Sequence, residues 1–151
     1  MDQYGYIDVM LRGKKMKQFA EHRYAGIRNK YGLRQVEIEA LMYLEKHPDA
    51  NSSLISRSLL INKGLLSLSM DHLVKKKLVI SKPDANDRRS ISFTLTAQGK
   101  AIVDECAALR SALAKRVLAG VTPEEIEVLC RVSLKLCENI ERIEQAGMDG
   151  M

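Results

Sequence analysis

The sequence predicts a mainly α-helical protein with one small β-hairpin. Apolar residues recur at helical spacings of three and four along most of the chain. Residues 51–78 hold two short helical patterns separated by a brief turn, and the stretch after them alternates apolar and polar residues. A hydrophobic share of 46% in 151 residues is sufficient for one domain with its own core.

Two helices are expected before residue 50, over residues 6–30 and 34–46. Their apolar side chains lie at helical spacing: Met16, Phe19, Ala20 and Ile27 in the first, and Val36, Ala40, Leu41 and Leu44 in the second. The "YGL" at residues 31–33 separates the two helices, because glycine readily adopts the conformation that ends a helix. Pro48 ends the second one.

A helix-turn-helix follows. "NSSLISRSLL" at residues 51–60 starts with helix-capping residues and covers about two turns, and Asn62 is expected to cap the next helix. The buried stripe of that second helix is Leu66, Ser69, Met70, Leu73 and Val74. The opposite side carries Gly64, Ser67, Leu68, Asp71 and Lys75.

A hairpin is expected directly afterwards. "VISKPD" is predicted to be one strand, "ANDR" the turn and "SISFTLT" the other strand, in which Ile91, Phe93 and Leu95 face the core. This arrangement places Asp87, Arg88 and Arg89 near the tip of the hairpin.

Two long helices complete the chain. Thr96 is expected to cap the first, whose buried line is Ile102, Cys106, Leu109, Leu113 and Val117, and Gly120 ends it. "TPEE" predicts the start of the second, with Thr122 as cap, Pro123 in the first turn and Glu125 completing a capping box. The apolar seam of this helix is Ile126, Leu129, Ser133, Leu136, Ile140 and Ile143. A seam of this kind needs a partner, so we expect the chain to dimerise.

Charge and composition narrow the function. Residues 51–100 carry nine basic against three acidic side chains, and residues 121–151 carry three against seven, so a polyanion is expected to bind around the hairpin. No run is long enough to span a bilayer and no cleavable signal is visible, which predicts a cytoplasmic protein without membrane contact. Three cysteines without C-x-x-C spacing fit packing in a reducing compartment. No nucleophile–base pair, metal cluster or phosphate-binding glycine loop is found, so no catalytic residue, metal or cofactor is expected.

"DHLVKKKLV" at residues 71–79 and "DANDRRSISFTLTAQGK" at residues 84–100 resemble the end of the second helix and the wing of the MarR family (multiple-antibiotic-resistance regulators). The resemblance implies a winged helix-turn-helix fold and a homodimeric DNA-binding regulator, often released by small aromatic ligands or oxidants. It also implies that Asp87 pairs with and orients Arg89. We therefore expect one domain over residues 1–151, with a DNA-binding part at 32–98 and helical dimerisation parts at 1–31 and 99–146.

The candidate DNA-binding residues lie on the helix-turn-helix and the hairpin: Ser52, Ser53, Arg57, Lys63, Gly64, Ser67, Leu68, Lys75, Asp87, Arg88 and Arg89. Leu68 cannot hydrogen-bond a base but can pack on a thymine methyl group. The candidate dimerisation residues are Ile126, Leu129, Leu136, Ile140 and Ile143. Phe19 and Tyr24 either line an aromatic-effector pocket or pack the dimer. The alternative hypothesis is a winged-helix dimer that binds protein rather than specific DNA, with Leu65 and Leu68 as an apolar contact patch.

Overall fold

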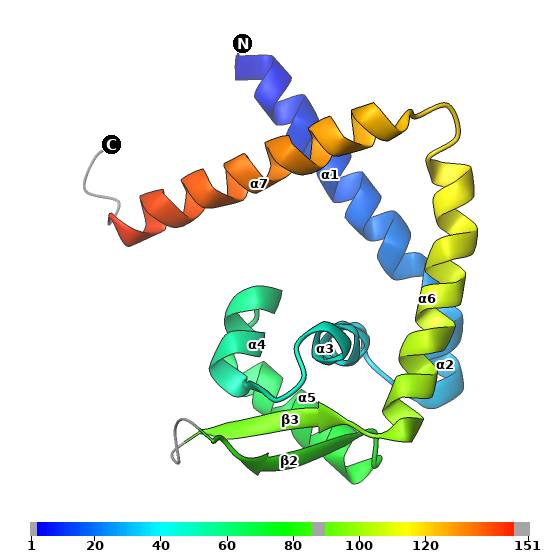
Figure 1. Ribbon diagram of the computed structural model, residues 1–151, viewed down its shortest axis with the longest axis vertical. Helices are drawn as coiled ribbons and strands as arrows, with labels where there is room; N and C mark the ends of the chain where they lie inside the picture. Colours follow the sequence, from blue (N-terminus) through cyan, green and yellow to red (C-terminus); the bar gives the residue numbers. More distant parts are fainter. Residues whose placement is uncertain (1–2, 86–89, 147–151) are drawn as a thin grey trace. The chain divides into compact units, whose positions relative to one another are not determined.

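The computed structural model describes residues 3–85 and 90–146, and its chain divides into two compact units, residues 1–111 and 112–151. The fold is mostly helical with a small antiparallel sheet, as the sequence predicts (Figure 1). The elements are α1 (Gln3–Arg23), α2 (Ala25–Tyr31), α3 (Gln35–Lys46), β1 (Ala50–Asn51), α4 (Ser52–Leu59), α5 (Lys63–Lys75), β2 (Val79–Pro83), β3 (Ile91–Leu95), α6 (Ala97–Val117) and α7 (Pro123–Gln145).

The expected single helix over residues 6–30 is wrong, because two helices, α1 and α2, meet at Tyr24. The break lets Tyr24 and Ile27 enter the core, whereas the side chains of α1 described over residues 8–23 are mostly exposed. Gly32 ends α2 as expected, with a φ of 61° that favours glycine.

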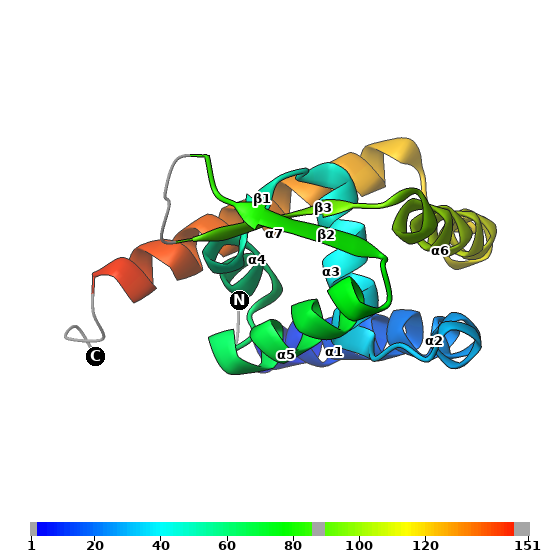
Figure 2. The ribbon, with the colours of Figure 1, turned by 90° about the horizontal axis from the view of Figure 1, so that it is seen from below.

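The sheet has three strands rather than the two expected. The strand order is β1-β3-β2, and both pairings are antiparallel (Figure 2). The additional strand, β1, contributes only two residues, Ala50 paired with Phe93 and Asn51 paired with Ser92. A two-residue strand has no periodicity, so nothing in the sequence pattern predicted it.

The expected alternation along β3 is only partly correct. Phe93 is buried, but Ile91 is 51% exposed and Ser92 is only 2% exposed. Ser92 is buried because it lies in the central strand between Asn51 and Lys82, and its hydroxyl donates to the Lys82 carbonyl at 3.4 Å. Ile91 pairs only with β2, beyond the end of β1, so its side chain has less cover.

The core of the first unit lies between the sheet, α3, α5 and the start of α6. Helices α3, α4 and α5 lie on one side of the hairpin formed by β2 and β3 (Figures 1 and 2). The largest side chains that are almost fully buried are Ile38, Leu41, Leu44, Ile55, Leu66, Met70, Leu73 and Ile102. The predicted buried stripe of α5 is thereby confirmed, with Ser69 buried and Val74 partly buried.

The "LTAQG" stretch connects the hairpin to α6 through tight contacts. The Thr96 hydroxyl donates to the Lys77 carbonyl at 2.8 Å and accepts from the Gly99 amide at 3.1 Å, which confirms the predicted cap. A Cβ atom on Gly99 would lie 2.1 Å from the Leu78 carbonyl oxygen. Only glycine permits this approach of α6 to the backbone at the start of the hairpin.

The predicted buried line of α6 holds at its start and not at its end. Ile102 and Cys106 are buried and Leu109 is partly buried, whereas Val117 is 53% exposed.

In the second unit, α7 begins as the sequence predicts. The Thr122 hydroxyl accepts from the Glu125 amide at 3.2 Å, and the Glu125 carboxylate accepts from the Thr122 amide at 2.8 Å.

Candidate nucleic-acid interface

Helix α5 presents one side to the core and the other to solvent. Asn62 caps the helix by accepting from the Leu65 amide at 2.8 Å, as the sequence predicts. The predicted DNA-contacting residues of this helix are all exposed: Lys63, Gly64, Ser67, Leu68 and Lys75. Leu68 is 64% exposed, so its apolar side chain points into solvent.

The first of the capping residues expected at residues 51–60 caps α4. Asn51 is the cap, and its Oδ1 atom accepts from the Leu54 amide at 3.0 Å. Ser52 and Ser53 occupy the first two helical positions, and Arg57 is exposed in the last turn. The amides of a helix N-terminus can bind phosphate, so both serines remain candidate contacts.

A groove of about 240 Å³ lies between α5, the hairpin and the start of α4. It brings together three of the predicted site residues, Ser52, Ser67 and Lys75. Its wall also contains Asp71 and Ser81, which the sequence analysis did not assign to the site. The position of Asp71 on the exposed side of α5 was visible in the sequence, and a carboxylate there can accept a hydrogen bond from a cytosine amino group.

The predicted wing residues Asp87, Arg88 and Arg89 lie outside the described residues. The strands that lead to them are described up to Ala85 and from Ser90. The ladder between the strands extends past β2, because the Asp84 amide donates to the Ser90 carbonyl at 2.9 Å.

Basic side chains of the helix-turn-helix fall into two groups. Within residues 3–85 and 90–146, Arg57, Lys63 and Lys75 form no ion pair. Lys76, in contrast, donates to the Tyr31 carbonyl at 2.9 Å. Cations that form no ion pair are available to a polyanion, so the first group suits phosphate contacts.

A buried carboxylate links α5 to the start of α3. Glu37 has no exposed surface, and its Oε1 atom accepts from His72 Nδ1 at 2.9 Å and from Arg34 Nη2 at 2.7 Å. Its Oε2 atom accepts from the Arg34 amide at 2.8 Å. Burial raises the pKa of Glu37, and the hydrogen bonds from Arg34 and His72 lower it. The lowering is the larger of the two effects, so the pKa lies below its ordinary value. Glu37 therefore remains ionised and holds α5 against α3.

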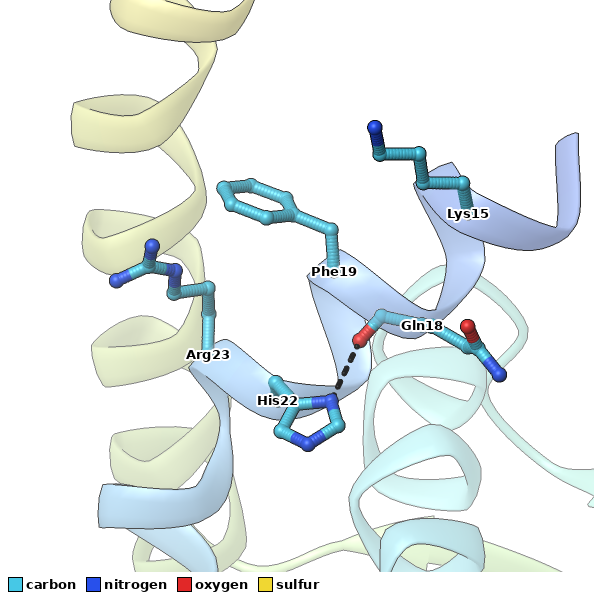
Figure 3. A pocket seen from close by; sticks show the side chains of 5 residues that line it. All are labelled: Lys15, Gln18, Phe19, His22 and Arg23. Atoms are coloured by element: carbon cyan, nitrogen blue, oxygen red, sulfur yellow. Dashed lines mark hydrogen bonds between the residues drawn. The ribbon is translucent and has the colours of Figure 1, made fainter. Parts of the chain in front are cut away.

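The two predicted effector residues lie in different environments. Phe19 is 39% exposed on α1, where it lines a depression of about 400 Å³ with Lys15, His22 and Arg23 (Figure 3). The Arg23 guanidinium lies 4.8 Å from the centre of the Phe19 ring. Tyr24 is only 8% exposed and belongs to the core, and its burial raises the pKa of its hydroxyl. Tyr24 therefore does not line the depression, and only Phe19 stays a candidate.

The predicted dimerisation residues lie along α7, and none is buried within one chain. Ile126 is half-buried, and the exposed fractions of the others range from 44% for Leu136 to 58% for Leu129. The packing expected of the three cysteines holds only for Cys106, which is buried on α6, whereas Cys130 and Cys137 are exposed on α7. Burial raises the pKa of the Cys106 thiol, which suits a packing role.

The described residues contain no cluster of three or more His, Cys, Asp or Glu side chains that could hold a metal ion. In the same part of the chain, no helix is both long and apolar enough to cross a membrane.

Fold and surface together define a winged helix-turn-helix protein, with α4 and α5 as the helix pair and β2 and β3 as the wing. Residues 31–90 match the sequence model of the MarR family. The match spans the helix-turn-helix and the first strand of the wing, and it confirms the resemblance to the MarR family inferred from the sequence.

Known relatives agree with this assignment. The chain is 29% identical over 119 residues to the HTH-type transcriptional repressor MdtR of Bacillus subtilis (strain 168). The aligned residues make up 79% of this chain and 77% of the relative. A MarR-family transcriptional regulator from Silicibacter pomeroyi has a similar structure, with a TM-score of 0.79, 22% identity and 91% of each chain covered. A mutant of MarR from E.coli complexed with operator DNA matches with a TM-score of 0.68 and 22% identity, over 90% of this chain and 99% of that one.

Proposed function

We propose that this protein is a homodimeric transcriptional regulator that binds a near-palindromic DNA operator. The observation that carries the proposal is the exposed side of α5, where Lys63, Ser67, Leu68 and Lys75 face solvent. Two of them, Ser67 and Lys75, line the groove next to the wing. In winged helix-turn-helix proteins this helix enters the major groove, so these side chains are placed to contact bases and phosphates. The relative MdtR is a transcriptional repressor, and one structural neighbour is bound to operator DNA, which supports DNA as the partner.

The dimer is proposed from the apolar surface of α7. Leu129, Leu136, Ile140 and Ile143 lie at heptad spacing and are each at least 44% exposed in the single chain. A soluble protein rarely leaves a stripe of this length uncovered, and a second copy of the same helix supplies a matching surface. Leu136→Asp should therefore shift the protein towards the monomer in light scattering, whereas Lys135→Asp, which changes an exposed basic residue of the same helix, should leave the dimer intact.

Selection of bound duplexes from a random pool tests the DNA-binding function. Two recognition helices related by two-fold symmetry dock about 34 Å apart, so the selected sites should contain inverted half-sites centred about ten base pairs apart. A·T pairs should be enriched at the outer minor grooves, where we place Arg88 and Arg89. Selection that enriches no sequence, from a protein shown to be folded and dimeric, would contradict the proposal.

An effector site is proposed at the depression around Phe19 on α1. Lys15 and Arg23 supply positive charge and Phe19 an aromatic surface, a combination suited to a small aromatic carboxylate. Benzoate and salicylate should raise the melting temperature of the wild type and shift that of Phe19→Ala less. Equal shifts in both proteins would place the binding elsewhere.

The alternative function is a dimer that binds another protein through the helix-turn-helix. Leu65 is 37% exposed and Leu68 is 64% exposed, and an apolar patch on this surface is the observation that favours it. A protein contact of this kind depends weakly on salt, whereas DNA binding weakens steeply with it.

A further inference from the structure

The turn before α4 is joined to the hairpin at several points. The Asp49 carboxylate accepts from Lys82 Nζ at 2.8 Å on β2 and from the Thr94 hydroxyl on β3. The backbone then pairs with β3 through Ala50 and Asn51. The turn therefore connects the helix-turn-helix to both strands of the wing.

Asn51 makes the connection that lies furthest along the hairpin. Its Oδ1 atom accepts from the Leu54 amide at 3.0 Å and caps α4, and its Nδ2 atom donates to Asp84 Oδ2 at 3.2 Å. Asp84 directly follows β2 and is only 8% exposed. One side chain thus serves the first turn of α4 and the outer part of the wing at the same time.

The two contacts also fix the orientation of the amide. The Leu54 amide requires an acceptor and the Asp84 carboxylate requires a donor, so a flipped amide would oppose both partners. Serine, threonine and aspartate are also good helix caps. Among the good caps, only asparagine carries an amide that donates to Asp84 while its oxygen accepts from the helix.

We propose that Asn51 is a positioning residue that fixes the direction of the wing relative to the helix-turn-helix. Asp84 is the last residue of the β2 side with a described ladder bond, because its amide donates to the Ser90 carbonyl. Anchoring the hairpin there limits rotation of its outer part, and a small rotation near the base produces a larger displacement further out. The consequence for DNA rests on the proposed function, in which the wing contacts the outer minor grooves.

Three variants separate the roles of Asn51. Asn51→Ser retains a good cap and removes the donor to Asp84, so α4 should remain intact. Asn51→Asp also caps but places a second carboxylate against Asp84, so it should loosen the wing more strongly. Asn51→Asp combined with Asp84→Asn exchanges the donor and acceptor, so the double variant should recover part of the effect.

Hydrogen exchange of the isolated protein tests the tether without DNA. In Asn51→Ser, amides of the β2–β3 ladder should exchange roughly fivefold faster, since a hydrogen bond to a charged group is lost, while amides of α4 and α5 keep their rates. Unchanged exchange in the hairpin overturns the proposal, and so does faster exchange that extends equally through α4, because that result identifies a capping effect.

Two lengths of a selected duplex test the effect on binding. A duplex of about 30 base pairs includes the outer minor grooves, and one of about 16 base pairs ends before them. Asn51→Ser should bind the long duplex about five- to tenfold more weakly and the short duplex within about twofold of the wild type, because only wing contacts are lost. An equal loss on both duplexes overturns the positioning role. If the wild type binds neither duplex while the hairpin of Asn51→Ser exchanges faster, the tether stands and the DNA-binding function is wrong.

Discussion

Glu37 offers a direct test of how α5 is held in place. The Glu37→Gln variant changes a side chain without exposed surface while keeping its shape. The carboxylate accepts hydrogen bonds at both oxygens, from the Arg34 amide and side chain and from His72. A glutamine has one oxygen, so in either orientation its amino group faces at least one of these donors. One buried donor without a partner costs about 1–3 kcal/mol, and part of the charge interaction is lost as well, so we expect about 2–3 kcal/mol of destabilisation at pH 7.

The pH dependence identifies the carboxylate as the cause. Because the pKa of Glu37 lies below its ordinary value of 4.5, its ionised form stabilises the fold fully above that pH. This stabilisation is lost as the pH falls below about 4.5 and through the folded-state pKa. Since glutamine does not titrate, the difference in the free energy of unfolding between wild type and Glu37→Gln should narrow over that range.

Urea unfolding followed by circular dichroism, at a fixed protomer concentration, measures this difference. Glu45→Gln is the matched control, because Glu45 forms a partly exposed ion pair with Lys100 at 2.8 Å. Its effect should stay within about 0.5 kcal/mol at any pH, as for other surface pairs. An equally small effect of Glu37→Gln at pH 7, or a difference from the wild type that does not change with pH, would refute the role assigned to Glu37.

Three further predictions concern the wing, the major groove and the backbone. Arg89→Ala should weaken operator binding by about 1–3 kcal/mol, and unchanged affinity of the folded variant would make Arg89 a surface charge. Replacing the thymine that Leu68 contacts with uracil should weaken binding modestly in each half-site, and Leu68→Ala should abolish this sensitivity in a binding titration. Lys77 has a φ of 58°, a left-handed conformation that glycine adopts more easily than lysine, so Lys77→Gly should raise the free energy of unfolding, measured by thermal unfolding, by about 1 kcal/mol. A loss of stability instead would show that contacts of the Lys77 side chain outweigh the backbone strain.

The local elements of this fold were predictable because their signals lie within a few residues. Asn62 and Thr122 cap α5 and α7 as their sequences indicate, and Gly32 ends α2. The contacts that were missed join residues distant in sequence. His72 lies 35 residues from Glu37, and Asp84 lies 33 residues from Asn51. A sequence pattern shows that a side chain is polar, but only the folded chain shows which distant group it meets.

The same limit applies to the candidate site. The exposed side of α5 followed from helical spacing, so Ser67, Leu68 and Lys75 were found from the sequence. The groove between α5 and the hairpin was not, because it depends on how the strands cross the helix. Exposure of α7 within one chain likewise shows an uncovered apolar surface, whereas the sequence showed only the spacing of its residues.

The salt dependence of DNA binding tests the central claim most directly. A fluorescently labelled duplex from the selection is titrated with protein between 50 and 200 mM salt, while light scattering monitors the oligomeric state at each concentration. A regulator that makes six or more phosphate contacts should lose about a thousandfold or more in affinity over this range, because bound counterions are released. An affinity that changes by less than about threefold, with the oligomeric state constant, would contradict the account and favour a protein partner for the helix-turn-helix.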